Sequence, residues 1–185
     1  FKNEHNSVAS ARESGLARTY NNNFQGSASF TYKILEGLSL RGNASTTFNL
    51  KDEHTFLRSM KFYTADSTDP IRTTRSSVEN KDNKMLEVNL QAYLDYAKSF
   101  GKHDLKGLLG YSQLYNQYRI LGASRKDLPL NNSLGEINAG DVTTQATEGN
   151  KVEYALRSAF ARVNYTFDNR YLLEANLRYD GTSRL

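Results

Sequence analysis

Six stretches of this chain alternate apolar and polar residues with a period of two, and this pattern constrains the fold more than any other feature. Successive side chains of a β-strand point to opposite faces, so each stretch predicts a strand with one apolar and one polar face. No helical segment is indicated between the stretches, and the sequence therefore predicts an all-β fold. In the clearest stretch the apolar face carries Tyr171, Leu173, Ala175, Leu177 and Tyr179, and the polar face carries Glu174, Asn176, Arg178 and Asp180.

The predicted strands are long. They exceed the ~5–6 residues of typical globular strands and reach the ~9–11 residues that a tilted strand needs to cross a bilayer. The alternation is weakest in the fourth strand, where Leu108, Leu109 and Tyr115 disturb it. The strands are expected at residues 22–33, 38–51, 84–99, 104–120, 152–167 and 170–182.

The connections between the strands alternate between short and long. Tight turns are expected at residues 34–37, 100–103 and 168–169, and long polar stretches cover residues 52–83 and 121–150. Successive connections of an antiparallel meander lie at opposite ends of the sheet, so the short turns share one end and the long loops the other. Outer-membrane barrels have this asymmetry, with short periplasmic turns and long extracellular loops. The sequence therefore predicts an antiparallel up-and-down transmembrane β-barrel segment.

The composition excludes several classes of function. The net charge is only +4 and the basic residues are dispersed, so no nucleic-acid partner is expected. The chain has no cysteine, which rules out disulfides and thiolate metal sites. Its three histidines, His5, His54 and His103, lie far apart, so neither a metal nor a cofactor is expected. No run of about 18 apolar residues predicts a transmembrane helix.

Three short motifs could suggest chemistry, but each is better explained as a loop or turn. Residues 52–54 (Asp-Glu-His) have no further ligands at metal-site spacing. Residues 180–183 (Asp-Gly-Thr-Ser) do not have the residue order of the aspartic-protease motif and occur once. Residues 66–70 offer oxygen ligands for calcium but lack the full ladder of a loop site. No catalytic residue is assigned, and the chain is not expected to be an enzyme.

The alternation alone leaves one alternative open. In a membrane barrel the apolar face points outward and the charged face lines a wet lumen, whereas in a soluble barrel the apolar face points inward. The alternative to a membrane barrel is a soluble or surface-exposed β-sheet module for binding or adhesion, with no transport role. Strand length and the asymmetry of the loops favour the membrane barrel.

Two stretches resemble the SusC/RagA family. Residues 160–184, FARVNYTFDNRYLLEANLRYDGTSR, are similar to the family's hairpin pattern GRVNY…RYLLxAxxRxDGSSRF. Residues 100–111, FGKHDLKGLLGY, are similar to its preceding pattern FGKHxLxxLxGY. The chain departs from the family at Ala161, where glycine is common, and at Leu185, where an aromatic residue is common. The first 80 residues are compatible with the family but less distinctive.

The resemblance implies a TonB-dependent transporter in the outer membrane of a Gram-negative bacterium. Such proteins have a barrel of about 22 strands with an N-terminal plug. Most pair with a SusD-like surface lipoprotein and import oligosaccharides, or in some members peptides, with energy passed on by the TonB complex. Residues 1–185 would form part of the barrel domain. The chain looks cut at both ends, and the plug, the TonB-contacting segment and the remaining strands are expected outside it.

Residue roles follow from the faces and the loops. An aromatic ring can stack on the apolar side of a sugar or on a peptide side chain, although the loop tyrosines could equally pack the loops together. We expect the lumen to be lined by Arg162, Glu174, Arg178 and Asp180, and the lipid to be met by Val88, Leu90, Leu173 and Leu177. Extracellular contacts with ligand or partner are expected from Tyr63, Tyr115 and Tyr118.

Overall fold

The computed structural model describes residues 7–64, 66–129 and 134–184, and nearly all regular structure in them is β. A short helix, α1 (Ser7–Glu13), precedes the first strand. Six long strands follow: β1 (Gly15–Leu35), β2 (Leu38–Leu57), β5 (Ser77–Phe100), β6 (His103–Lys126), β7 (Ala146–Phe167) and β8 (Tyr171–Thr182). The smaller elements are β3 (Lys61–Phe62), β4 (Arg72–Thr73) and the 3₁₀ turns η1 (Ile137–Ala139) and η2 (Val142–Thr144).

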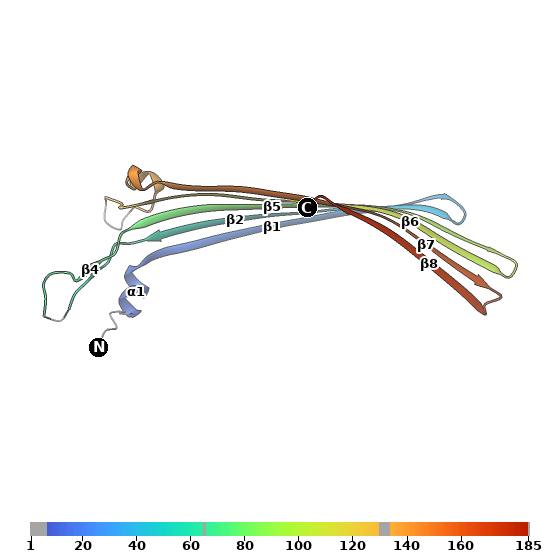
Figure 1. Ribbon diagram of the computed structural model, residues 1–185, viewed down its shortest axis with the longest axis horizontal. Coiled ribbons are helices and arrows are strands. Elements are labelled where there is room, and N and C mark those ends of the chain that lie inside the picture. Colours follow the sequence, from blue (N-terminus) through green and yellow to red (C-terminus); the bar gives the residue numbers. More distant parts are fainter. Residues whose placement is uncertain (1–6, 65, 130–133, 185) are drawn as a thin grey trace. The chain divides into compact units, whose positions relative to one another are not determined.

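The long strands form one antiparallel sheet in the order β1-β2-β5-β6-β7-β8, so each pairs with the long strand next to it in the chain (Figure 1). The small β3 and β4 form a separate hairpin in which Lys61 lies opposite Thr73. This up-and-down order confirms the predicted all-β architecture. None of the helices in the described ranges has the length and apolar character needed to cross a membrane.

The strands are longer than the alternation predicted. The predicted loop at residues 52–83 contains the end of β2 and the start of β5, and the predicted loop at residues 121–150 contains the end of β6 and the start of β7. These boundaries were wrong because most residues of the extensions are polar, with Phe56 and Val78 among the apolar exceptions. The neighbouring residues Glu53 and His54 show this. Asn83 Nδ2 donates to Glu53 Oε2 at 2.9 Å, whereas His54 Nδ1 lies 2.7 Å from Asn80 Oδ1. A strand with polar side chains on both faces shows no alternation of apolar and polar residues, so the sequence does not reveal it.

The chain divides into two compact units. Unit 1 comprises the described parts of residues 1–22, 50–84 and 119–151, and unit 2 those of residues 23–49, 85–118 and 152–185. The three tight turns that join β1 to β2, β5 to β6 and β7 to β8 all belong to unit 2. Both long connections belong to unit 1. The predicted separation of short turns from long loops is therefore present.

Unit 1 contains a small hydrophobic core. Phe56 of β2, Val78 of β5 and Leu128 are buried together, and Val78 is 0% exposed. Ile137 and Ala139 of η1 pack against them. The core therefore attaches Leu128 and η1 to the strands.

Polar contacts hold the same connection at its start. Ser76 is buried; its backbone oxygen accepts from Asp127 N and its Oγ accepts from Leu128 N, both at 2.9 Å. Arg75 Nε donates to Asp127 Oδ1 at 2.7 Å, and a second guanidinium nitrogen contacts the other carboxylate oxygen. The hydrogen bond from Arg75 lowers the pKa of Asp127, so the carboxylate remains charged in this contact.

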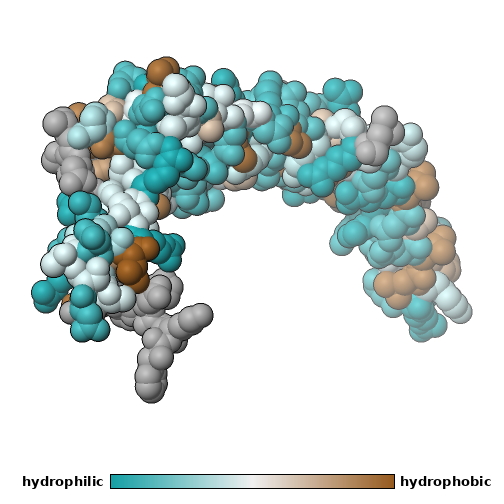
Figure 2. Space-filling view, turned by 60° about the vertical axis from the view of Figure 1, so that its left-hand side comes forward, coloured by the Kyte–Doolittle hydropathy of each residue, from teal (hydrophilic) through white to brown (hydrophobic). Residues whose placement is uncertain are grey.

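Unit 2 contains no buried apolar side chain among its described residues, in contrast to unit 1. Its strands carry exposed apolar residues, including Phe30, Leu90, Leu173 and Leu177. In Figure 2, hydrophobic side chains (brown) are open at the surface among hydrophilic ones (teal). The apolar rows do not meet one another in a sealed interior, as a soluble fold would require.

Shortening Leu128 to alanine should loosen the 127–145 connection, because a buried leucine truncated in this way costs ~2–5 kcal/mol. The measurement is the rate of protease cleavage within residues 127–145 of the intact protein. Leu128→Ala should be cut faster than the parent. Val142→Ala, whose side chain is 66% exposed in the same connection, is the control. Equal cleavage of the parent and both variants would contradict the role of the core.

Candidate functional site

The polar face of β7 and β8 is the part of unit 2 where the predicted lumen residues lie. In the register of the two strands, Arg162 lies opposite Asn176, Phe160 opposite Arg178, and Ser158 opposite Asp180. Because alternate residues of a strand share a face, these residues lie on one side of the hairpin. The four predicted residues Arg162, Glu174, Arg178 and Asp180 are therefore on a common face.

Two hydrogen-bonded groups organise this face. In the first, Arg162 Nε donates to Asn176 Oδ1 at 2.8 Å, and Asn176 Nδ2 donates to Glu174 Oε1 at 2.7 Å. In the second, Arg178 Nε lies 2.9 Å from both carboxylate oxygens of Asp180, and its Nη2 donates to Ser158 Oγ at 3.3 Å. Each guanidinium has a local acceptor, whereas the buried Oδ1 of Asn164 on the same face has no hydrogen-bond partner.

An aromatic pair lies on the same face and was not predicted as a feature of it. The rings of Tyr93 and Phe160 meet edge to face, with centroids 5.8 Å apart. Arg41 stacks over Tyr93 at 5.1 Å, and Arg178 over Phe160 at 5.9 Å. Arg41 also pairs with Asp95, with an Nη2–Oδ1 distance of 2.8 Å. The period of two could have indicated Phe160, because it lies two residues before Arg162 in the same strand.

Gly110 of β6 makes room for this aromatic pair. A Cβ atom at position 110 would lie 2.1 Å from the ring of Phe160, so the ring rests directly over the glycine backbone. Beside the ring is a shallow groove of about 490 Å³, lined in part by Leu108, Arg162 and Asn176. The groove combines an apolar floor with cationic and amide groups at its edge.

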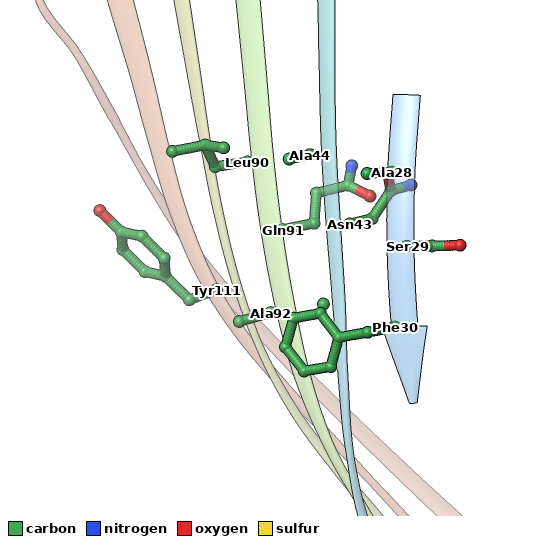
Figure 3. A pocket seen from close by; sticks show the side chains of 10 residues that line it. Ala28, Ser29, Phe30, Asn43, Ala44, Leu90, Gln91, Ala92 and Tyr111 are labelled. Atoms are coloured by element: carbon green, nitrogen blue, oxygen red, sulfur yellow. The ribbon is translucent and has the colours of Figure 1, made fainter. Parts of the chain in front are cut away.

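The opposite face of unit 2 carries a second, almost wholly apolar groove of about 400 Å³ (Figure 3). Its floor is made by small residues, and the ring of Phe30 rests on Gly42, where a Cβ atom would lie 2.1 Å away. Figure 3 shows Ala92 between the rings of Phe30 and Tyr111. The apolar residues that line it are Ala28, Phe30, Ala44, Leu90, Ala92 and Tyr111. The lining of this groove contains no charged side chain.

The predicted loop tyrosines lie in different environments. Tyr63 follows β3 in unit 1 and is 53% exposed. Tyr115 and Tyr118 lie within β6, in unit 2, because this strand runs on to Lys126. Tyr115 donates through its hydroxyl to Glu153 Oε1 at 3.0 Å, so its polar end is already engaged by a neighbouring strand. Contact with a ligand or partner remains a prediction for all three tyrosines.

The described ranges contain no group of three or more His, Cys, Asp and Glu side chains that could hold a metal ion. Glu53 and His54, from the acidic motif considered above, make separate contacts with Asn83 and Asn80. The site chemistry of the described chain is therefore hydrogen bonding, ion pairing and aromatic contact.

Adding a methyl group at position 110 should displace the Phe160 ring and weaken its contact with Tyr93. We expect Gly110→Ala to lower the free energy of unfolding by about 0.5–1.5 kcal/mol, the range for aromatic pairs. In a Phe160→Ala background the same change should cost less, because the obstructing ring is gone. Urea unfolding of the full-length protein in lipid measures both. Gly149→Ala, where a Cβ meets nothing within 4 Å, is the matched control. Additive costs in the double variant would contradict the contact.

Comparison with known proteins gives the chain its relatives. No protein-family model matches it. One TonB-dependent receptor of Formosa agariphila is 31% identical over 90% of the chain, and a second from the same organism is 27% identical over 94%. The chain spans only 16% and 17% of the length of these two relatives.

Solved structures share the fold. Two structures of RagAB, described as a peptide transporter and as a peptide importer in the "closed-closed" state, match 91% of the chain. Their TM-scores are 0.72 and 0.73, at 22% and 21% identity, and the chain covers 18% of each. Sequence relatives and fold agree with the two-faced sheet described above. The chain belongs to the TonB-dependent receptors and shares its fold with part of the RagAB structures.

Proposed function

We propose that residues 1–185 form part of the barrel wall of a transporter that imports an oligosaccharide or a peptide across the outer membrane of a Gram-negative bacterium. The observation that carries the proposal is the sheet of unit 2, which has one exposed apolar face, one charged face and no buried apolar side chain among its described residues. An exposed apolar face of this kind suits contact with lipid hydrocarbon, and the polar face suits contact with water.

In this arrangement the faces have separate roles. The apolar face, with Val88, Leu90, Leu173 and Leu177, meets outer-membrane lipid. The polar face, with Arg162, Glu174, Arg178 and Asp180, lines the lumen. The ion pair of Arg178 with Asp180 and the amide hydrogen bonds of Arg162 and Glu174 hold these charged groups in a polar wall that suits a hydrated solute.

The connections in unit 1 are proposed to be extracellular. In the second connection Leu128 and η1 share the small core and Asp127 is held by Arg75, which suits a preformed contact surface at these described residues. The 58–76 connection carries the exposed Tyr63. We propose a SusD-like lipoprotein and the imported ligand as the partners of these connections. Energy would come from the TonB complex through a segment outside this chain.

The alternative is a soluble or surface-exposed module for binding or adhesion. It needs the apolar rows of the sheet to be covered by other parts of the protein. Buried apolar side chains of the described chain are confined to the small core of unit 1, which leaves the exposed rows of unit 2 uncovered. No observation favours the alternative over the membrane barrel.

The orientation of the faces can be tested with an arginine scan of β8. If Leu177 meets lipid near the bilayer midplane, Leu177→Arg should cost ~2–4 kcal/mol of folding free energy. Leu172 and Leu173 are neighbours on opposite faces, opposite Thr166 and Tyr165, and provide a pair matched for position along the strand. Leu173→Arg should cost more than Leu172→Arg. Folding into lipid vesicles, measured by urea titration, gives all three values, and a larger cost for Leu172→Arg would reverse the assignment.

Import can be tested by deleting the gene for the whole protein in its own bacterium. The deletion should abolish growth on one class of nutrient, either oligosaccharides or peptides, supplied as the limiting source. The full-length protein should restore growth, and removal of TonB should block it again. Comparison of the two nutrient classes identifies the cargo. Undiminished growth of the deletion strain on both classes would reject the proposal, as would recovery of the protein from a soluble fraction.

A further inference from the structure

The turns at the β5–β6 and β7–β8 hairpins carry a cluster of aromatic rings around a histidine. His103 stacks on Phe100 with ring centroids 5.2 Å apart, and its ring lies 5.0 Å from that of Phe167. Its Nδ1 is 2.5 Å from the Tyr165 hydroxyl oxygen. Tyr171 extends the stack from Phe167 at 6.4 Å. Rings that combine an apolar body with a polar tip prefer the boundary between hydrocarbon and water.

The two turns are joined to each other. Asp168 and Asn169 both have positive φ, 51° and 53°, and Arg170 N donates to Phe167 O at 3.0 Å. This is a type I′ turn, which matches the twist of a β-hairpin. The backbone N–H of Asp168 donates to the backbone oxygen of Lys102 at 2.8 Å. The two neighbouring turns therefore form a single surface at the ends of four strands.

Cationic side chains exceed carboxylates on this surface. Lys102 Nζ lies 3.0 Å from Asp168 Oδ1, and Arg170 Nε lies 4.0 Å from Asp168 Oδ2, so two cations share one carboxylate. Both are well exposed, at 67% and 77% of their side-chain area. Across residues 98–106 and 165–171 there are four lysines and arginines but only two carboxylates. Arg170 is therefore only loosely held by Asp168, and an anion can approach it without breaking the closer ion pair of Lys102.

We propose that this surface, the paired turns with Lys102, Arg170 and the His103 aromatic cluster, binds the phosphate headgroup of an anionic phospholipid. The inference rests on the proposed function, since it requires the barrel to stand in a membrane. Lysine offers the phosphate a point charge, and arginine offers two parallel donors. The rings place this charge at the level where lipid headgroups lie, and the apolar face of the sheet continues toward the acyl chains.

The chemistry favours a lipid over a free anion. A free phosphate would contact only the two exposed cations. Because both cations are open to solvent, they would bind the phosphate weakly. A phospholipid adds contact between its glycerol and acyl region and the rings of Phe100, Phe167 and Tyr171, two of which are highly exposed at 50% and 69%. The combination of uncovered rings and unbalanced positive charge therefore selects a ligand that is anionic and lipidic.

The test uses the full-length receptor purified in detergent and titrated with phosphatidylglycerol or phosphatidylethanolamine, with bound lipid counted by native mass spectrometry. The parent should bind phosphatidylglycerol more tightly. Lys102→Ala/Arg170→Ala should weaken this binding by roughly tenfold. A matched double variant in unit 1, Arg58→Ala/Lys61→Ala, removes the same number of charges from exposed positions and should leave it unchanged. Equal binding by the parent and the Lys102→Ala/Arg170→Ala variant would overturn the proposal.

Two further measurements use only the unaltered receptor, so their results do not depend on whether the variant folds. Raising the salt concentration should weaken phosphatidylglycerol binding, because exposed charges are screened. Inorganic phosphate should compete poorly with the lipid. Insensitivity to salt, or full displacement by inorganic phosphate, would overturn the lipid assignment.

The failure of this inference can be separated from that of the proposed function. The Lys102→Ala/Arg170→Ala variant should still reach the outer membrane and support import, because neither residue lies among the proposed lumen or loop contacts. A receptor that is found in the outer membrane and imports its nutrient, but shows no preference for phosphatidylglycerol, rejects only the lipid site. If the unaltered receptor is absent from the outer membrane, the proposed function is rejected.

Discussion

Pairing of the backbone polar groups is the constraint on which the rest of this structure depends. A segment that stands in hydrocarbon must pair every backbone N–H and C=O within the protein, and a β-sheet does this only between neighbouring strands. The order β1-β2-β5-β6-β7-β8 satisfies the four inner strands on both sides. The outer strands β1 and β8 each have one neighbour here, and their residues are exposed almost throughout. In the proposed barrel, further strands would pair with these two edges.

With the strand pairing fixed, the sheet of unit 2 has one polar and one apolar face, and each face is built from different residues. Charged residues of the polar face are matched with acceptors one or two residues away or on the next strand, as Arg178 is with Asp180 and Ser158. The apolar face instead combines rings with small residues, as Phe30 does with Gly42. Among the described residues neither face of unit 2 has a sealed core, and in the proposed barrel lipid would cover the apolar face.

The sequence could predict the two-faced part of the strands, but it could not predict their polar ends. Residues such as Leu173 and Glu174 alternate because their surroundings differ, so the period of two is visible in unit 2. Glu53 and His54 point to opposite faces and both meet polar partners, so the strand continues without any period. The aromatic pair of Tyr93 and Phe160 escaped prediction for a different reason. It depends on the pairing of strands that are far apart in the chain and on a glycine, Gly110, in a third strand.

The small core of unit 1 follows from the same physics. In the proposed barrel the connections of unit 1 would lie outside the hydrocarbon, where lipid cannot cover apolar residues and a fixed shape requires local burial. Phe56 lies near the end of β2 and Val78 near the start of β5, whereas Leu128 follows β6. Their contact therefore joins the residues after β6 to the sheet. Polar contacts at Ser76 and Arg75 then set the direction in which the chain leaves β6. A surface held in this way keeps its shape before any partner arrives, and binding to it avoids most of the entropic cost of ordering a flexible loop.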